Sequence, residues 1–201
     1  MQDTNLLENK EEKVEIMYNL LLDKLPNYTP SGFKIRTDFR ESIKFELLMQ
    51  DNKIKEKDKV LLALNLYYYE IPTDIEKAID DMLWFYRAGK ETKTSQSKEE
   101  KQEQIYSYEF DDEYIYDAYK DQYNIDLNSI RYLHWWKFKA MFEGLKDDNK
   151  IVEIMGYRAI DLSKIKDKEE KKKYKKLKKI YALPDMRTQE QKEADFASAF
   201  L

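Results

Sequence analysis

His134 is the chain's only histidine and the one side chain whose ordinary pKa suits acid–base chemistry near neutral pH. It lies in the apolar stretch IRYLHWWKFKAMFEGL, residues 130–145. Nucleophilic catalysis would also need a serine or threonine and an orienting acid beside it, and the sequence does not show that such groups converge there. On a helical wheel His134 falls in the apolar sector. We therefore interpret it as a core residue whose ring nitrogens bond to a carbonyl or carboxylate, and expect no catalytic residue.

Three acidic residues, Glu113, Asp117 and Asp121, repeat every four positions and would share one helix face. Paired carboxylates can transfer protons or hold a metal ion. Helical metal sites of this kind add a histidine three or four residues away, whereas His134 is thirteen residues beyond Asp121. We expect a solvated face, with no metal and no cofactor.

Residues 164–179 contain ten lysines against three acidic residues, a local charge of +7 in a chain of net charge −4. Lysines can neutralise phosphates, but this run has no arginine for reading bases. Its apolar residues, Tyr174, Leu177, Ile180 and Tyr181, fall on one helical stripe. We expect an amphipathic helix that binds no nucleic acid; an acidic protein partner suits it better.

The composition narrows the class of protein. At 201 residues the chain can bury roughly 70% of its unfolded surface. The absence of cysteine excludes disulfides and thiol chemistry. Only four glycines and four prolines favour an all-α fold. No export signal opens the chain and no apolar run approaches the length of a membrane span, so we expect no membrane association.

Hydrophobic spacing predicts a helical bundle. The expected helices cover about residues 4–25, 38–50, 55–69, 73–88, 111–123, 129–143, 147–156 and 166–182. Thr37 or Asp38 would cap the second helix, and Thr73 with Glu76 would form a capping box for the fourth. A very short β-hairpin near residues 27–37 is left open.

The segment KETKTSQSKEEKQEQ, residues 90–104, has no apolar side chain. It predicts a flexible linker that divides the chain. The expected organisation is an N-terminal helical half (1–89), the linker, a C-terminal helical half (105–185) and a C-terminal tail (186–201).

Several longer strings carry a family resemblance. They are TDFRESIKFELLMQD, FYRAGKE, FDDEYIYDAYKDQYNIDLNSIRYLHWWKFKAMFEGL and IMGYRAIDLSKIKDKEEKKKYKKLKKIYALPD. In order and over about residues 25–185, the chain resembles the siphophage proteins called gene product fifteen. The shortest specific elements are TDFR (37–40), YxIDL (123–127) and LHWWKF (133–138). The first helix and the tail after Asp185 depart from the pattern.

The resemblance implies a non-enzymatic protein from the tail module of long-tailed phages. Proteins of that kind are thought to be tail assembly chaperones that coat the tape measure protein and help recruit tail-tube subunits. The implied partners are the tape measure protein, the major tail protein and a second tail assembly chaperone. The implied location is the host cytoplasm, with absence from the mature virion. Self-association is left open.

Specific side chains follow from these patterns. We expect Phe39, His134, Trp135 and Phe138 to form the core of the shared motifs. Candidate partner contacts are Tyr132, Trp136, Lys139, Phe196 and Phe200, because exposed aromatic surface beside charge suits binding of an apolar client.

Two other functions remain as alternatives. The protein could be a permanent tail component, such as a connector or terminator. It could also be an enzyme or host-directed effector that uses His134 and the acidic face of residues 113–121.

Overall fold

The structure, a computed structural model, describes residues 18–90 and 104–185. Within these ranges the backbone forms seven helices and no β-strand, so the expected all-α fold is confirmed. The helices are α1 (Phe39–Gln50), α2 (Glu56–Tyr67), α3 (Ile75–Tyr86), α4 (Asp112–Tyr123), α5 (Trp135–Glu143), α6 (Lys150–Ala159) and α7 (Lys168–Ile180).

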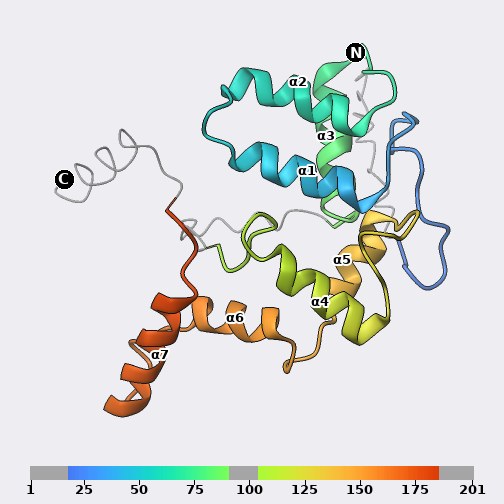
Figure 1. Ribbon diagram of the computed structural model, residues 1–201. Helices are drawn as coiled ribbons and strands as arrows, with labels where there is room; N and C mark the ends of the chain where they lie inside the picture. Colours follow the sequence, from blue (N-terminus) through green and yellow to red (C-terminus); the bar gives the residue numbers. More distant parts are fainter. Residues whose placement is uncertain (1–17, 91–103, 186–201) are drawn as a thin grey trace, which may run out of the picture.

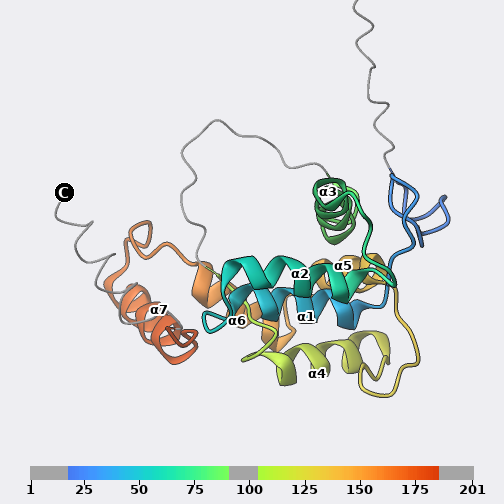
Figure 2. The same ribbon diagram turned by 90° about the horizontal axis from the view of Figure 1, so that it is seen from above.

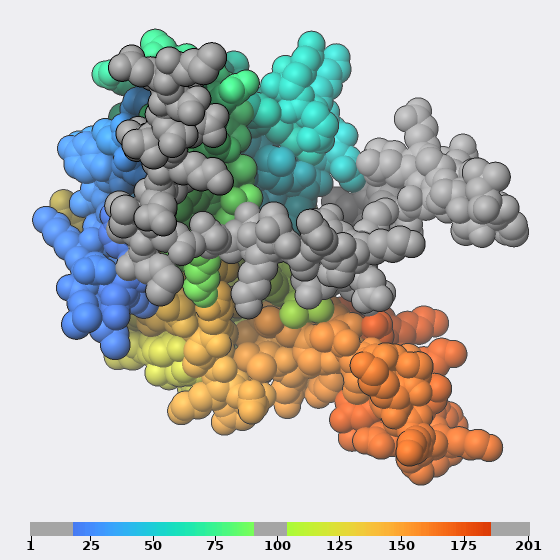
Figure 3. All heavy atoms as spheres, turned by 180° about the vertical axis from the view of Figure 1, so that it is seen from behind, coloured from blue at the N-terminus to red at the C-terminus, as the bar shows by residue number. Residues whose placement is uncertain are grey.

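The helices pack as neighbouring pairs (Figure 1). α1 packs against α2 and α5, and α2 packs against α3. α4 packs against α6, which in turn supports α7. α7 lies at one end of the molecule in both ribbon views (Figure 2). From behind, the orange and red side chains of α6 and α7 project beside the main body (Figure 3).

One apolar core crosses both halves of the sequence. At its centre the ring of Phe138 on α5 is fully buried. It stacks against Phe39 of α1 and Tyr119 of α4, each with ring centroids 4.8 Å apart. Stacked rings stabilise a core beyond the area that they bury. In space, therefore, the N-terminal and C-terminal halves are joined through α5; the expected linker lies almost wholly outside the described residues.

Side-chain caps fix where several helices begin. The Asp38 carboxylate accepts a hydrogen bond from the Arg40 N–H, which selects Asp38 over Thr37 as the cap of α1. The expected Thr73 capping box is wrong. Asp74 is the N-cap of α3, and its carboxylate accepts from the Lys77 N–H at 3.1 Å, because its side chain reaches the free donors of the first turn.

The expected helix over 129–143 is also corrected, because α5 begins only at Trp135. The backbone before it pairs with the backbone before α1: the Phe39 N–H donates to the Leu133 oxygen at 2.9 Å, and the Trp135 N–H donates to the Thr37 oxygen at 2.8 Å. A helix from 129 would use these groups internally. Pairing between distant segments therefore overrides the local periodicity.

The first expected helix, residues 4–25, is wrong over its described part. Residues 18–25 contain a turn at residues 20–22 and no helix, and residues 1–17 lie outside the described part of the chain. The Asn19 N–H donates to the Asp23 carboxylate, and the Asn19 side chain accepts from the Leu21 N–H. Such local side-chain bonds compete with a helix.

The expected helix over 147–156 ends too early, because α6 continues past Gly156 to Ala159. The packing of α6 on α4 offsets the roughly 1 kcal/mol that a helical glycine costs.

The hairpin left open near residues 27–37 is present as a single bridged turn. Tyr28 and Lys34 form an isolated antiparallel bridge, and Gly32 turns the chain with φ +84°. Asp81 of α3 holds this turn, since its carboxylate accepts a 2.6 Å hydrogen bond from the Thr29 hydroxyl.

Candidate functional site

His134 sits at the N-terminus of α5 as its N-cap and is 4% exposed. Its Nδ1 accepts from the Trp136 N–H at 3.1 Å, and its Nε2 lies 3.2 Å from the Pro26 oxygen. Because Nδ1 must accept, Nε2 carries the proton and donates to that carbonyl, so the ring is neutral. Burial lowers the pKa of His134, with Lys137 adding to the effect and the Pro26 carbonyl opposing it. Both nitrogens are engaged within the protein, as expected for a core histidine.

Replacing His134 by asparagine should make stability less dependent on pH. Asparagine keeps an N-cap acceptor but loses the bond to Pro26. We therefore expect the free energy of unfolding to fall by about 1–3 kcal/mol at pH 7.5. Because the pKa of His134 is lowered in the folded state, the stability that the neutral ring contributes is present above the unfolded pKa of about 6.5 and is lost as the pH falls below it. The difference in free energy of unfolding between wild type and variant should therefore become smaller below about pH 6.5, by up to about 1.4 kcal/mol per pH unit.

Denaturant unfolding at several pH values measures this difference. The comparison with the variant is needed because Glu46 titrates in the opposite sense: burial raises the pKa of Glu46 even though it accepts a 2.8 Å bond from the Tyr86 hydroxyl. A difference that stays constant from pH 7.5 to 5 would contradict a neutral His134.

The TDFR motif contacts the segment around LHWWKF residue by residue. Thr37 shares a 2.7 Å hydrogen bond with the Tyr132 hydroxyl, and Asp38 accepts from the Leu133 N–H at 3.3 Å. Arg40 donates to the Leu127 and Ile130 carbonyls at 2.9 and 2.8 Å. The two strings that carry the resemblance therefore form one structural junction. Its role is to join α1 to α5.

Trp135 and Trp136 fasten α5 to the end of α3. Their indole N–H groups donate to the carbonyls of Tyr86 and Phe85, each at 2.8 Å. These carbonyls belong to the last turn of α3, where the regular bonds to residues four positions later are missing; the Phe85 carbonyl also accepts from the Ala88 N–H at 3.0 Å. Gly89 follows with φ +72°, and a Cβ there would lie 3.1 Å from the Trp136 ring.

The expected contact at Trp136 is corrected, because this residue is 4% exposed and offers no surface to a partner. The buried indole N–H needs an acceptor, and α3 supplies it. Tyr132 is 51% exposed, but its hydroxyl is held by Thr37. Lys139 forms an ion pair with Glu143 at 3.3 Å, further along α5. Phe196 and Phe200 lie outside the described residues. Of the three candidate contacts that the structure describes, Tyr132 and Lys139 therefore reach the surface and Trp136 does not.

Of the remaining motif residues, Phe39, Trp135 and Phe138 are buried with His134. Glu113, Asp117 and Asp121 are exposed along α4. Over residues 18–90 and 104–185, no three His, Cys, Asp or Glu side chains are placed to share a metal ion.

The structure contains a buried ion pair between Asp111 and Arg158 that the sequence pattern does not predict. The guanidinium donates to both carboxylate oxygens at 2.6 and 2.9 Å, and also to the carbonyls of Tyr181 and Ile105. It thereby ties the start of α4 to α6 and to the end of α7. The sequence feature that could have indicated this pair is the choice of arginine at position 158 in a half of the chain rich in lysine. The planar guanidinium is the cation suited to buried ion pairs.

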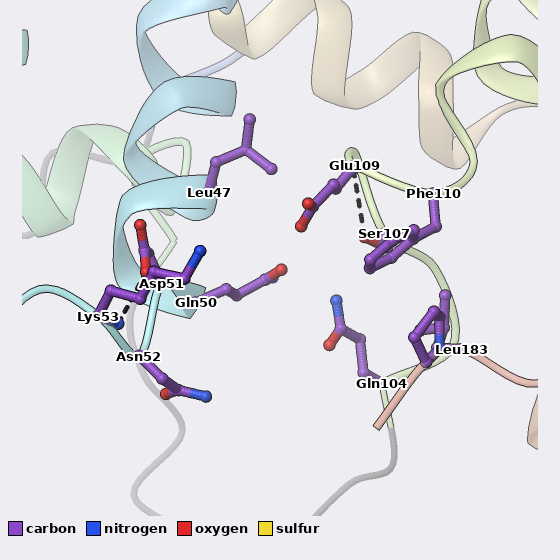
Figure 4. A pocket seen from close by; sticks show the side chains of 11 residues that line it. Leu47, Gln50, Asp51, Asn52, Lys53, Gln104, Ser107, Glu109, Phe110 and Leu183 are labelled. Carbon is purple, nitrogen blue, oxygen red and sulfur yellow. Dashed lines mark hydrogen bonds between the residues drawn. The ribbon is translucent and has the colours of Figure 1, made fainter. Parts of the chain in front are cut away.

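A cleft lined by both polar and apolar side chains lies between the end of α1 and residues 104–110 and 183–184 (Figure 4). Gln50 and Asp51 line one side, with Gln104 and Glu109 facing them. Ser107 also lines the cleft, and its hydroxyl oxygen accepts a hydrogen bond from the Glu109 N–H at 3.2 Å. The described lining contains no histidine. Its polar side chains are suited to forming hydrogen bonds with a ligand and do not form an acid–base pair for catalysis.

An apolar groove, here the α1–α2 groove, runs between α1 and α2. Its apolar lining is Leu47, Leu48, Leu62 and Leu66, with Lys44, Asp51 and Asn65 as its polar residues. α2 also exposes three consecutive apolar side chains, Val60, Leu61 and Leu62, at 41%, 56% and 43%. Ala63, Leu64 and Tyr67 of the same helix are buried. A helix that is apolar on all sides is normally covered. The string VLLALNLY, apolar at nearly every position, is the signal that could have marked this surface.

The family model described as Bacteriophage Gp15 protein matches residues 21–183. The chain belongs to this family. Membership makes it a bacteriophage protein and indicates a structural or assembly role. No curated protein and no solved structure gave a significant match.

In this Gp15 family protein, the matched range includes all seven described helices and both halves of the TDFR–LHWWKF junction. It also includes the α1–α2 groove. None of the helices in the described ranges is long and apolar enough to cross a membrane.

Proposed function

We propose that the protein is a non-enzymatic phage tail assembly chaperone that binds the tape measure protein and assists assembly of the tail tube. The supporting observation is the α1–α2 groove with the exposed apolar side of α2. A helical, apolar client could lay one face into this groove, because amphipathic helices bind to apolar grooves through side chains spaced three or four residues apart. Lys44 and Asp51 at the groove would keep the complex hydrated.

The groove, and not the residues near Trp136, is the proposed client site. Apolar contact supplies affinity, and Leu62 is the side chain that both lines the groove and remains 43% exposed. Contacts with the major tail protein or with a second tail assembly chaperone would then use other surfaces.

Co-expression with the tape measure protein of the same tail module tests this proposal. Wild type should keep the client soluble and co-elute with it in size exclusion. Leu62→Lys should weaken binding by about 10–100-fold, because it places a charge where apolar area would be buried. Ile75→Lys is the matched control, since Ile75 is 42% exposed but lies on α3. Insoluble client with wild type, or equal effects of both variants, would refute the proposed site.

The proposal places the protein in the host cytoplasm and outside the finished particle. Mass spectrometry of purified virions should find it at trace level or not at all. Stoichiometric amounts in virions would instead support the alternative of a permanent connector or terminator.

A further inference from the structure

α7 presents a broad basic face to solvent. Steps of 100° per residue place six exposed lysines on one contiguous arc: Lys168, Lys171, Lys172, Lys175, Lys176 and Lys179. Among the described residues, none of these six forms an ion pair. No side chain of α7 is fully buried. The helix is thus a charged surface without a counterpart within the described parts of its own chain.

A second groove, the α1–α4 groove, carries the opposite charge. Phe39, Ile43, Ile115 and Leu127 contribute its apolar lining, and its volume is about 690 Å³. Arg40 also lines it, but its guanidinium is already paired with Asp38 and bonded to two backbone carbonyls. Asp112, Glu113 and Asp117 of α4 line the same groove and are exposed. Apolar lining beside carboxylates suits a helix that is both basic and amphipathic.

The charged rows of the two helices have the same spacing. On α7, Lys168, Lys172 and Lys176 repeat every four residues, as do Glu113, Asp117 and Asp121 on α4. Four residues of α-helix rise about 6 Å, so both rows place a charge at about that interval. Two such helices laid side by side can bring the three lysines opposite the three acidic residues.

The α7 of the same chain is held away from this groove. Its C-terminal end is fixed to α6, because Arg158 donates to the Tyr181 carbonyl at 2.6 Å and Tyr157 stacks on Tyr181 with centroids 5.6 Å apart. Figures 1 and 2 place α7 at the end of the molecule, with α6 between it and α4. The complementary helix therefore has to come from another molecule.

We propose that a second copy of this chain docks the lysine row of its α7 along the acidic edge of the α1–α4 groove. Ile180, which is 59% exposed on α7, adds apolar contact beside that row. The two docking surfaces differ, so the contact is head-to-tail. Repeated from copy to copy, it produces a ring or an open string of subunits. This assembly is independent of the client site in the α1–α2 groove.

A charge-swap experiment with the full chain tests the contact. Sedimentation velocity at low salt should show self-association of wild type, which is lost near 1 M salt, where the screening length is about 3 Å. Lys172→Glu with Lys176→Glu should weaken it about 100-fold, and so should Glu113→Lys with Asp117→Lys, because each places like charges together. Mixing the two variants, or combining all four changes in one chain, should restore association. Lys53→Glu with Lys57→Glu is the control of equal charge change and should associate like wild type.

Other results would overturn the proposal. Wild type that stays monomeric at low salt and high concentration excludes the contact. Association that survives the lysine changes or high salt points to another interface, such as the apolar side of α2. Retention of a DNA fragment by a monomeric wild type, lost in the lysine variant, would assign the basic face to nucleic acid instead. Circular dichroism of each variant checks that it remains folded.

Discussion

Replacing Arg158 by alanine should lower the free energy of unfolding by about 3–5 kcal/mol, because it leaves a buried carboxylate without its cation. The partner, Asp111, is 1% exposed. It also accepts a bond from the Ser107 N–H at 2.9 Å, but that single donor cannot replace two guanidinium bonds. The change also frees the carbonyls of Tyr181 and Ile105, so the end of α7 should lose its attachment. Denaturant unfolding measures the loss as a lower midpoint.

Three further variants sharpen this result. Arg158→Lys keeps the charge but not the fork of donors, so it should recover only part of the loss. Arg158→Met with Asp111→Asn should also recover part, because no unpaired charge remains. Lys164→Ala removes an exposed pair with Asp161 and should cost less than about 1 kcal/mol. If Arg158→Ala costs no more than this control, the pair does not hold α4, α6 and α7 together.

Phe138→Ala should destabilise the fold by a similar amount, about 3–5 kcal/mol. The reason is the position of its ring, which contacts Phe39 on one half of the sequence and Tyr119 on the other. The change leaves a cavity and removes both stacked contacts. Phe138→Leu should cost less, because it fills part of the space. Phe110→Ala, at a ring that is 39% exposed, should cost about 1 kcal/mol or less.

Hydrogen exchange on Phe138→Ala gives a second readout. Because α5 joins the two halves, amides of α1 and α4 should lose protection together. Loss confined to the half that contains Phe138 would mean that the halves are separate folding units, as the sequence division at residues 90–104 suggests.

The proposed functions assign different surfaces to different partners. The α1–α2 groove would hold an apolar client, and the contact between α7 and the α1–α4 groove would join copies of the chain. Leu62→Lys affects the first alone and the paired lysine changes affect the second alone, so each can fail without the other. The TDFR–LHWWKF junction supports both indirectly, since it fixes α1, which borders both grooves.

Much of the fold is predictable from local pattern. Hydrophobic spacing places α1, α3, α4 and α7 within a few residues of their observed bounds, and the sequence offers Asp38 as one of two candidate caps of α1. The apolar setting of His134 indicates a buried ring with both nitrogens bonded, as the structure shows. The family resemblance also rests on sequence alone. These features depend on residues close in the chain or on composition.

What only the tertiary structure decided depends on distant partners. α5 begins only at Trp135 because the Leu133 carbonyl accepts from the Phe39 N–H and the Trp135 N–H donates to the Thr37 carbonyl. No periodicity reports that pairing. Trp136 is buried because the end of α3 leaves a carbonyl within reach of its indole. Asp111 and Arg158 are 47 residues apart, and each is unremarkable without the other. The sequence by itself therefore determined most of the helices, their polarity and the family. Packing determined where α5 begins, which side chains are covered and which surfaces remain for partners, because burial depends on contacts made across the whole chain.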